Sequence, residues 1–235
     1  MGSRVCALAL AQGWEVVSVS RRGAPTEVPP SLAGVQWRQG DATDESTARE
    51  VLQEGGFSGV FHCVGLLFEG AANRFVSGSG SVPSAGATYD LVTRRSALAA
   101  AAAAAELCTS QDGGPPPFGF VSAAEAGWNF KAPVEWLERY LIAKRAVERE
   151  LLASGEAGRL RPIILRPSLV WSTERPGSLP SVAAFYAANA LGLPFVDRPV
   201  NVDTLAGAAV NALGDAQARG ILRFPEMERW AAQKR

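Results

Sequence analysis

Hydrophobic residues recur along the chain in short, β-branched runs separated by longer segments with helical periodicity. Short runs of this kind predict buried strands, and the segments between them predict helices. The predicted strands are residues 14–20, 35–38, 59–64, 118–122, 161–166 and 220–224. The predicted helices are residues 3–12, 44–54, 88–108, 134–153, 180–190 and 203–213. Strands that alternate with helices predict a parallel sheet and an α/β fold.

Polar and small residues mark the ends of these elements. Ser3 is expected near the N-cap of the first helix and Gly13 at its end, and Asp44 is expected to cap the second helix. Residues 66–86 are rich in Gly, Ser and Ala and have no periodicity, which predicts a functional or a mobile loop.

Composition narrows the class of protein. Hydrophobic residues make up 47% of the 235 residues and charged residues 20%, as in ordinary globular proteins. This length predicts one domain, residues 1–235, or one domain with a small added lobe. Residues 168–219 are expected to contribute a small C-terminal substrate lobe. Lys+Arg and Asp+Glu number 23 each, so charge gives no support to nucleic-acid binding. Three scattered Cys and one His predict no metal site, and no apolar run reaches the roughly 18 residues of a membrane span.

A Tyr and a Lys four residues apart are the first candidate for chemistry. Tyr140 and Lys144 fall on one face of a predicted helix, between strand 118–122, which ends at Ser122, and strand 161–166. Such a pair also occurs on solvated helix faces, so the flanking strands carry the prediction. Lys144 is expected to lower the pKa of the Tyr140 phenol, and Ser122 to orient a substrate carbonyl.

Residues after the first predicted strands suggest a dinucleotide site. Arg21 and Arg22 follow strand 14–20, where an Arg accommodates the 2′-phosphate of NADP, so they favour NADP(H) over NAD(H); a solvated turn is the alternative. Asp41 and Ala42 follow the next strand and are candidates to lie beside an adenine.

Two later strand ends complete the predicted cofactor site. Cys63, Val64 and Gly65 end strand 59–64, and the glycine would let backbone approach a ribose or nicotinamide. Pro167 would shape the loop at the nicotinamide end. His62 is expected to be a core residue. Trp128, Trp136 and Trp171 are candidates for a hydrophobic substrate pocket or for core packing.

Together these residues resemble the extended and atypical short-chain dehydrogenase/reductase superfamily, whose fold is a Rossmann-like, doubly wound parallel sheet. The resemblance covers nearly the whole chain. It rests on Gly40-Asp41, Cys63-Val-Gly65, Phe120-Val-Ser122, Tyr140-x-x-x-Lys144 and Ile164-Leu-Arg-Pro167. It implies hydride transfer to or from a carbonyl or alcohol of a small hydrophobic substrate, with Ser122, Tyr140 and Lys144 catalytic and Lys144 also a ribose ligand.

Within that superfamily the chain looks most like the branch with the accessory Rossmann subunit of respiratory complex I and the fungal dehydrogenase-like protein of coenzyme Q biosynthesis. Segments 88–97, 199–203 and 220–224 carry this likeness. The branch implies a second function, a non-catalytic accessory or assembly subunit of a mitochondrial membrane complex. Whether the chain is an enzyme stays open. The likeness implies a mitochondrial location on the matrix side, at the inner membrane, with chloroplast or cytoplasm as alternatives.

The chain departs from the superfamily at its start. Gly2 aligns with the last glycine of the family's glycine-rich phosphate turn, and the first strand, central in the sheet, is absent from the sequence. A truncated sequence is our preferred explanation; a processed chain, a donated strand and a degenerate protein are the alternatives. Without that strand, two neighbouring strands are expected to leave backbone unpaired, and binding of the cofactor's pyrophosphate to be impaired.

Overall fold

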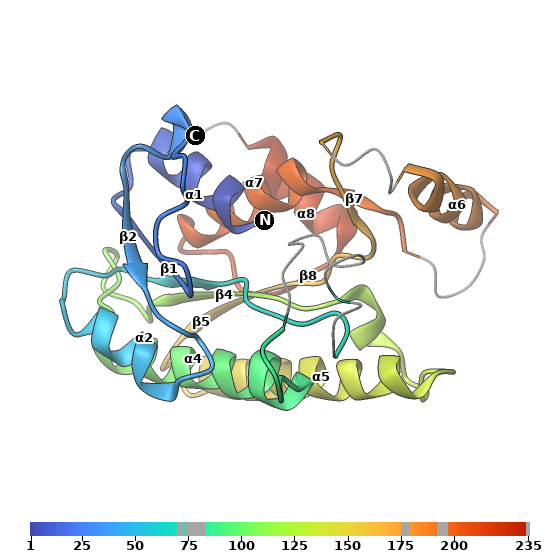
Figure 1. Cartoon of the computed structure of the whole chain (residues 1–235), viewed down its shortest axis with the longest axis horizontal. Helices are drawn as coiled ribbons and strands as arrows, with labels where there is room; N and C mark the ends of the chain where they lie inside the picture. Colours follow the sequence, from blue (N-terminus) through green and yellow to red (C-terminus); the bar gives the residue numbers. More distant parts are fainter. Residues whose placement is uncertain (70–72, 74–82, 175–178, 192–196, 234–235) are drawn as a thin grey trace.

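The structure, a computed structural model, describes residues 1–69, 73, 83–174, 179–191 and 197–233 (Figure 1). Most of the predicted loop 66–86 lies outside these residues. Parallel strands form a central layer with helices on both faces. The helices on one face are α1 (Gly2–Ala11), α7 (Val202–Leu213) and α8 (Phe224–Ala232). Those on the other are α2 (Glu45–Leu52), α4 (Ser96–Leu107) and α5 (Glu135–Glu156).

The larger sheet holds four parallel strands in the order β3-β4-β5-β8. These strands are β3 (Val60–His62), β4 (Pro117–Val121), β5 (Arg161–Leu165) and β8 (Gly220–Leu222). The side chains of β4 and β5 alternate between the two faces of the sheet, and both faces are covered. Phe118, Phe120 and Ile164 pack toward α4 and α5, whereas Ile163 and Leu165 pack toward α7. Burial on both faces explains why these strands are almost continuously apolar in sequence.

A smaller sheet pairs β1 (Val16–Ser20) with β2 (Val35–Gln39), also in parallel. Among the described residues, β1 pairs with β2 alone and β3 with β4 alone, so each strand keeps one unpaired edge. Val16 of β1 and Phe61 of β3 nevertheless pack against the same core below α1 and α7. The break between the two sheets is therefore where the absent central strand was expected, and the predicted parallel α/β fold is confirmed.

Short elements follow the main sheet toward the C-terminus. β6 (Val170–Trp171) pairs with β7 (Val200–Asn201), and α6 (Leu179–Ala190) lies to one side of the layers (Figure 1). The range 168–219, which the sequence assigns to a small lobe, also contains α7, and α7 packs on the main sheet between α1 and α8.

Most predicted elements are present, with local differences. Asp44 caps α2 through a hydrogen bond from Ser46 N, and Gly13 follows α1 with a φ of +80°, a conformation that favours glycine. Ser3 is not the cap of α1, because the helix already begins at Gly2. The predicted helix 88–108 starts with a π-helical turn, η2 (Asp90–Arg95), before α4. The sequence analysis missed β6, β7, α8 and the 3-10 helices η1 (Pro30–Leu32) and η3 (Ala124–Gly127).

Candidate active site

The predicted catalytic pair lies against the carboxyl end of β4. Lys144 on α5 is buried, and its Nζ donates a hydrogen bond of 2.6 Å to the carbonyl oxygen of Val121, the last residue of β4. The same Nζ lies 4.7 Å from the ring centroid of Phe120 and 5.6 Å from that of Tyr140. The fold therefore brings Tyr140 and Lys144 to the strand end that carries Ser122, as the sequence predicted.

Gly65 lies beside the ammonium group of Lys144. A Cβ atom at Gly65 would lie 3.4 Å from Lys144 Nζ, so the glycine leaves room around the ammonium. Thr93, from the π-helical turn, closes the same corner, and its Oγ1 accepts a hydrogen bond of 3.4 Å from Leu66 N. The sequence analysis did not single out Thr93. Thr93 follows Tyr89 by four residues, and the Tyr89 ring lies 5.8 Å from the Tyr140 ring, a contact that only the structure shows.

The Ser122 hydroxyl is buried and has no hydrogen-bond partner among the described residues. Its backbone is fixed, because Ser122 N donates to Leu165 O at 2.7 Å and so continues the pairing of β4 with β5. Buried hydroxyls nearly always have a partner, so this one is available to a bound ligand. Its place at the strand end agrees with the predicted role in orienting a carbonyl.

Electrostatics around the pair differ from the sequence-based expectation. The pKa of Tyr140 is raised above its ordinary value, first by burial and then by the charges of Glu125 and Tyr89, rather than lowered by Lys144. Burial lowers the pKa of Lys144 to about 8. The Lys144 ammonium donates its hydrogen bond to the Val121 carbonyl, so in the unliganded chain it does not lower the pKa of the Tyr140 phenol.

His62 is a core residue, as expected. It is buried at the end of β3, and its Nε2 lies 3.3 Å from Ser96 Oγ. Burial, and secondarily the charge of Lys144, lowers its pKa to about 4, so the ring is neutral near pH 7.

The residues predicted to hold the adenosine end of a dinucleotide follow β1 and β2. Arg21 and Arg22 are exposed directly after β1, and Arg21 Nη1 donates to Ser84 Oγ at 2.8 Å. Asp41 Oδ1 accepts hydrogen bonds from Thr43 N and Oγ1, which hold the pKa of this carboxyl below its usual value. Ala42 lies in the same turn, half-buried.

The remaining cofactor candidates lie at the start of α1 and at the ends of β3 and β5. A Cβ atom at Gly2 would lie 3.2 Å from Cys63 Sγ, so the start of α1 meets the end of β3. Val64 continues from Cys63 toward Gly65. Pro167 follows β5, and its carbonyl accepts a hydrogen bond of 2.8 Å from Ala124 N. These residues therefore line the two strand ends on either side of Ser122.

The three candidate tryptophans have separate neighbours. Trp128 packs in the cluster that contains Tyr140 and stacks on Phe130 with a centroid distance of 5.0 Å. Trp136 contacts Phe68. Trp171 lines a cavity of about 200 Å³ in the C-terminal region with Tyr186, Arg198 and Phe224. Only Trp128 shares a packed cluster with Tyr140.

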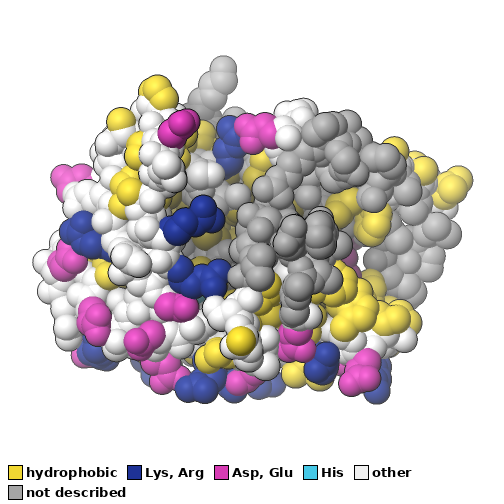
Figure 2. Space-filling model, viewed as in Figure 1, with side chains coloured by type: hydrophobic (Ala, Val, Ile, Leu, Met, Phe, Trp, Pro, Cys, Tyr) yellow, Lys and Arg dark blue, Asp and Glu magenta, His cyan; other side chains and the backbone are white. Residues whose placement is uncertain are grey.

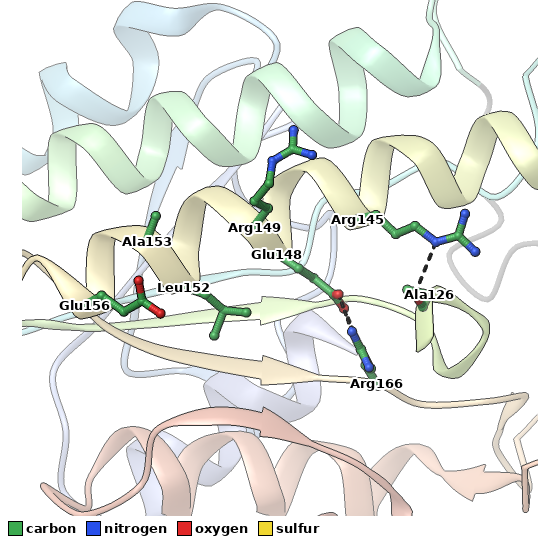
Figure 3. Close-up of a pocket in the computed structure, with 8 residues that line it drawn as sticks. All are labelled: Ala126, Arg145, Glu148, Arg149, Leu152, Ala153, Glu156 and Arg166. Carbon is green, nitrogen blue, oxygen red and sulfur yellow. Dashed lines mark hydrogen bonds and ion pairs between the residues drawn. The ribbon is translucent and has the colours of Figure 1, made fainter. Parts of the chain in front are cut away.

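A second cavity, of about 400 Å³, lies along the flank of α5 and contains none of the predicted site residues (Figure 3). Arg166 crosses it to Glu148 with two hydrogen bonds of 2.8 and 2.5 Å. Arg145, also on this flank, donates to the carbonyl oxygen of Ala126 (Figure 3). The cavity is thus lined by side chains that brace α5 against β5 and η3.

Surface charge and metal-binding side chains indicate no further site in the described part of the chain. Figure 2 shows basic and acidic side chains interspersed on the described part of one face, rather than a field of a single sign. Within the described ranges, no three His, Cys, Asp or Glu residues lie close enough to hold a metal ion. No helix in those ranges is long and apolar enough to cross a membrane.

Comparisons with known proteins identify the class of fold. Residues 1–75 match the family model described as the NAD dependent epimerase/dehydratase family. A short-chain type dehydrogenase/reductase from Mycobacterium ulcerans superposes with a TM-score of 0.66 at 21% identity, over 96% of this chain and 85% of that one. UDP-glucose 4-epimerase from Thermus thermophilus, in complex with NAD, superposes with a TM-score of 0.61 at 21% identity, over 94% and 73% of the two chains. The chain therefore has the Rossmann-like α/β fold of these proteins.

A curated relative covers the whole chain. It is an uncharacterized chloroplastic protein of Arabidopsis thaliana, 25% identical over 253 residues, which span 100% of this chain and 75% of the relative. The descriptions of these similar proteins do not mention respiratory complex I or coenzyme Q biosynthesis, so the likeness to that branch is not shown.

Proposed function

We propose that the chain is an NAD(P)(H)-binding oxidoreductase of the short-chain dehydrogenase/reductase kind, acting on a carbonyl or alcohol of a small hydrophobic substrate. One observation carries the proposal: the neighbouring ends of β3 and β4 bring together Gly65, Lys144, Tyr140 and Ser122, whose buried hydroxyl has no partner among the described residues. Ligands of open α/β sheets bind at the carboxyl ends of the strands. The family match over residues 1–75 supports the cofactor class.

Each residue has a task in this proposal. A bound nicotinamide supplies or accepts the hydride. Ser122 Oγ donates a hydrogen bond to the substrate oxygen, and Tyr140 gives that oxygen its proton during reduction. Lys144 binds the nicotinamide ribose, and once it leaves the Val121 carbonyl its charge favours the phenolate. Trp128, next to Tyr140, forms an apolar wall for the substrate.

The preference for NADP(H) over NAD(H) rests on Arg21 and Arg22. Both are exposed after β1, the position from which an arginine reaches a ribose 2′-phosphate. Gly2, Asp41, Ala42, Cys63, Val64 and Pro167 complete the proposed cofactor contacts.

Binding and turnover test the proposal separately. Calorimetry with NADPH and NADH measures cofactor binding, and a panel of quinone-like and steroid-like carbonyls measures turnover. Tyr140→Phe is expected to lower turnover by 10²–10⁴-fold with cofactor affinity unchanged. Tyr186→Phe is the matched control, because that hydroxyl bonds Pro199 O in the C-terminal region. Equal turnover by the two variants would refute the role of Tyr140, and absence of binding by either nucleotide would refute the cofactor.

A second candidate function is a scaffold, the accessory or assembly subunit of a mitochondrial membrane complex. The observation that favours it is the unactivated site: burial raises the pKa of Tyr140, and Lys144 is engaged with backbone. Loss of the cellular role in a deletion strain that Tyr140→Phe fully rescues would support the scaffold over the enzyme. For location, the chloroplastic relative favours the chloroplast over a mitochondrial matrix site, and import of a fluorescent fusion decides between them.

A further inference from the structure

The chain between Ser122 and α5 carries two aromatic residues close to the candidate site. Trp128 stacks on Phe130 with a centroid distance of 5.0 Å and an interplanar angle of 14°. Trp128 and Tyr140 also pack against one buried cluster, formed by Ala123, Ala126, Ala132 and Leu141. The segment that follows Ser122 is therefore part of the apolar surroundings of the Tyr140 ring.

A single guanidinium on α5 holds the middle of this segment. Arg145 donates from Nε to the carbonyl oxygen of Ala126 and from Nη2 to that of Trp128, each at 3.2 Å; Figure 3 shows the bond to Ala126. Two nitrogens of one planar group thus fix two carbonyl oxygens that lie two residues apart. The guanidinium has its donors in a rigid fork, whereas a lysine donates from a single nitrogen and cannot reproduce this arrangement.

Glu138, two helical turns before Arg145, holds the far end of the segment. Its Oε1 accepts a hydrogen bond of 3.3 Å from Arg145 Nη1, and its Oε2 accepts one of 2.6 Å from Ala132 N. The side chains of Arg145 and Glu138 are 27% and 14% exposed, so solvent screens this ion pair less than a pair at the surface. We call Arg145 and Glu138 the clamp, because together they fix the backbone at Ala126, Trp128 and Ala132.

The clamp acts on the segment rather than on the helix that carries it. Within the described ranges, the side-chain hydrogen bonds of Arg145 and Glu138 reach the segment or each other, and none reaches the backbone of α5. Val134, the N-cap residue of α5, has no side-chain cap. The two charged residues therefore do not serve to close the end of the helix, and their common target is the position of the aromatic pair.

We propose that the clamp sets the position of Trp128 and thereby selects substrates that carry an apolar ring next to the reacting carbonyl. The inference rests on the proposed oxidoreductase function. A substrate whose carbonyl meets Ser122 and Tyr140 extends its apolar part along the cluster that Trp128 shares with Tyr140. The indole offers a wide, flat apolar face, which suits a flat ring. Arg145 and Glu138 are positioning residues in this role, since they act through Trp128.

The position of the Trp128 indole can be followed without turnover. In the full chain labelled with fluorotryptophan, Trp128→Phe identifies the Trp128 resonance in ¹⁹F NMR, and the other tryptophan resonances report whether a variant is folded. Arg145→Lys should shift or broaden the Trp128 resonance. Arg149→Lys, one turn further along α5 with a side chain 74% exposed, should leave it in place. Glu138→Gln should have a smaller effect, because Ala132 N keeps an acceptor. An unmoved Trp128 resonance in Arg145→Lys overturns the clamp.

Kinetics test the selectivity. The probes are tetralone, in which the ketone belongs to a fused ring system, and butanone, which has no ring. Arg145→Lys should lower the ratio of kcat/KM for tetralone over butanone by about tenfold, with the loss in the KM for tetralone rather than in kcat. Trp128→Ala should lower the same ratio. Adding Arg145→Lys to Trp128→Ala should lower it no further, because both changes act through one indole.

The outcomes separate the selectivity from the proposed function. An equal loss with the two ketones, or the same ratio in Arg145→Lys and Arg149→Lys, overturns the selectivity while the oxidoreductase function stands. A wild-type chain that is inactive toward both ketones and toward the wider carbonyl panel overturns the oxidoreductase function and the selectivity with it.

Discussion

The two main sheets of this protein are both parallel but differ in how completely they are enclosed. In the β3-β4-β5-β8 sheet, β4 and β5 have strand neighbours on both sides and helices on both faces. In the β1-β2 sheet, β1 has one strand neighbour, and all its side chains are half-buried or exposed. The difference matches the residues of the strands, because β4 and β5 are almost continuously apolar, whereas β1 and β2 contain Ser18, Gln36 and Arg38 and stay partly exposed.

The two sheets also divide the proposed function. The enclosed sheet carries Ser122 and braces Lys144, the groups proposed for proton transfer. The open sheet carries Arg21 and Asp41, the groups proposed for the adenosine end of the cofactor. The groups proposed for proton transfer are therefore held by an enclosed sheet. The groups proposed for adenosine binding are held by the β1-β2 sheet, which has an unpaired edge among the described residues.

The largest expected difference between the two sheets is in amide hydrogen exchange. Amides of β4 and β5 should exchange only through global unfolding, whereas amides of β1 and β2 should open locally and exchange about 10²–10³-fold faster. Mass spectrometry of exchange in the unliganded chain measures both. Equal protection of the two sheets would show that the unpaired edge of β1 costs nothing in local stability.

A variant extended before Met1 by an apolar strand and a short glycine-containing turn tests whether the unpaired edge of β1 causes the difference between the two sheets. Such a strand can pair with β1 and β3 together, so it should raise the protection of β1 toward that of β4. It should also slow alkylation of Cys63, which is exposed beside the start of α1, and leave buried Cys108 unchanged. An extension of the same length with prolines at alternate positions is the control, since proline cannot donate to a ladder.

Breaking an ion pair should cost more stability in the enclosed sheet than in the β1-β2 sheet. Glu148 and Arg166 brace the enclosed sheet with side chains 5% and 16% exposed, so Glu148→Gln leaves a buried charge and should cost about 3–5 kcal/mol of unfolding free energy. Glu54 pairs with Arg38 of β2 at the surface, where solvent screens the pair, and Glu54→Gln should cost much less stability than Glu148→Gln. Urea denaturation measures both, and equal losses would contradict the contrast in enclosure.

Sequence patterns predicted most of this fold because the main helices have a regular apolar face and the main strands are short apolar runs between them. They also placed Ser122, Tyr140 and Lys144 at one strand end, since the order of elements fixes which ends meet. β6 and β7 were missed because two-residue strands have no measurable period. α8 was missed because the predicted strand 220–224 ran into Phe224, the first residue of the helix, although Pro225 and Glu226 are typical of a helix start.

Other features required the three-dimensional arrangement. The sequence predicted that Lys144 lowers the pKa of Tyr140, but burial of the phenol outweighs a cation that is bonded to Val121 O. Thr93 reaches the site from a π-helical turn, which has no periodic signal in the sequence. Spacing along the chain shows which groups can meet, whereas burial decides what they do.

Acid should destabilise the enclosed sheet through His62 at its edge. Its pKa is about 4 when folded and about 6.5 when unfolded, so between these values the unfolded chain binds a proton that the folded chain does not. Stability is therefore lost as the pH falls from about 6.5 to 4, by up to about 3 kcal/mol. His62→Gln should flatten this part of the stability profile measured by urea denaturation. An unchanged slope would show that His62 is not buried in its neutral form.

The smallest expected effect is on nucleotide choice in the open half. Removing Arg21 and Arg22 together should weaken NADPH binding by about tenfold and leave NADH affinity unchanged, because only the 2′-phosphate distinguishes the two. The double variant Arg21→Ala/Arg22→Ala is compared with Arg38→Ala, a change on the same sheet whose guanidinium pairs with Glu54. Calorimetry with both nucleotides measures the ratio. An equal loss of affinity for NADPH and NADH would mean that the arginines stabilise the β1-β2 sheet rather than bind the 2′-phosphate.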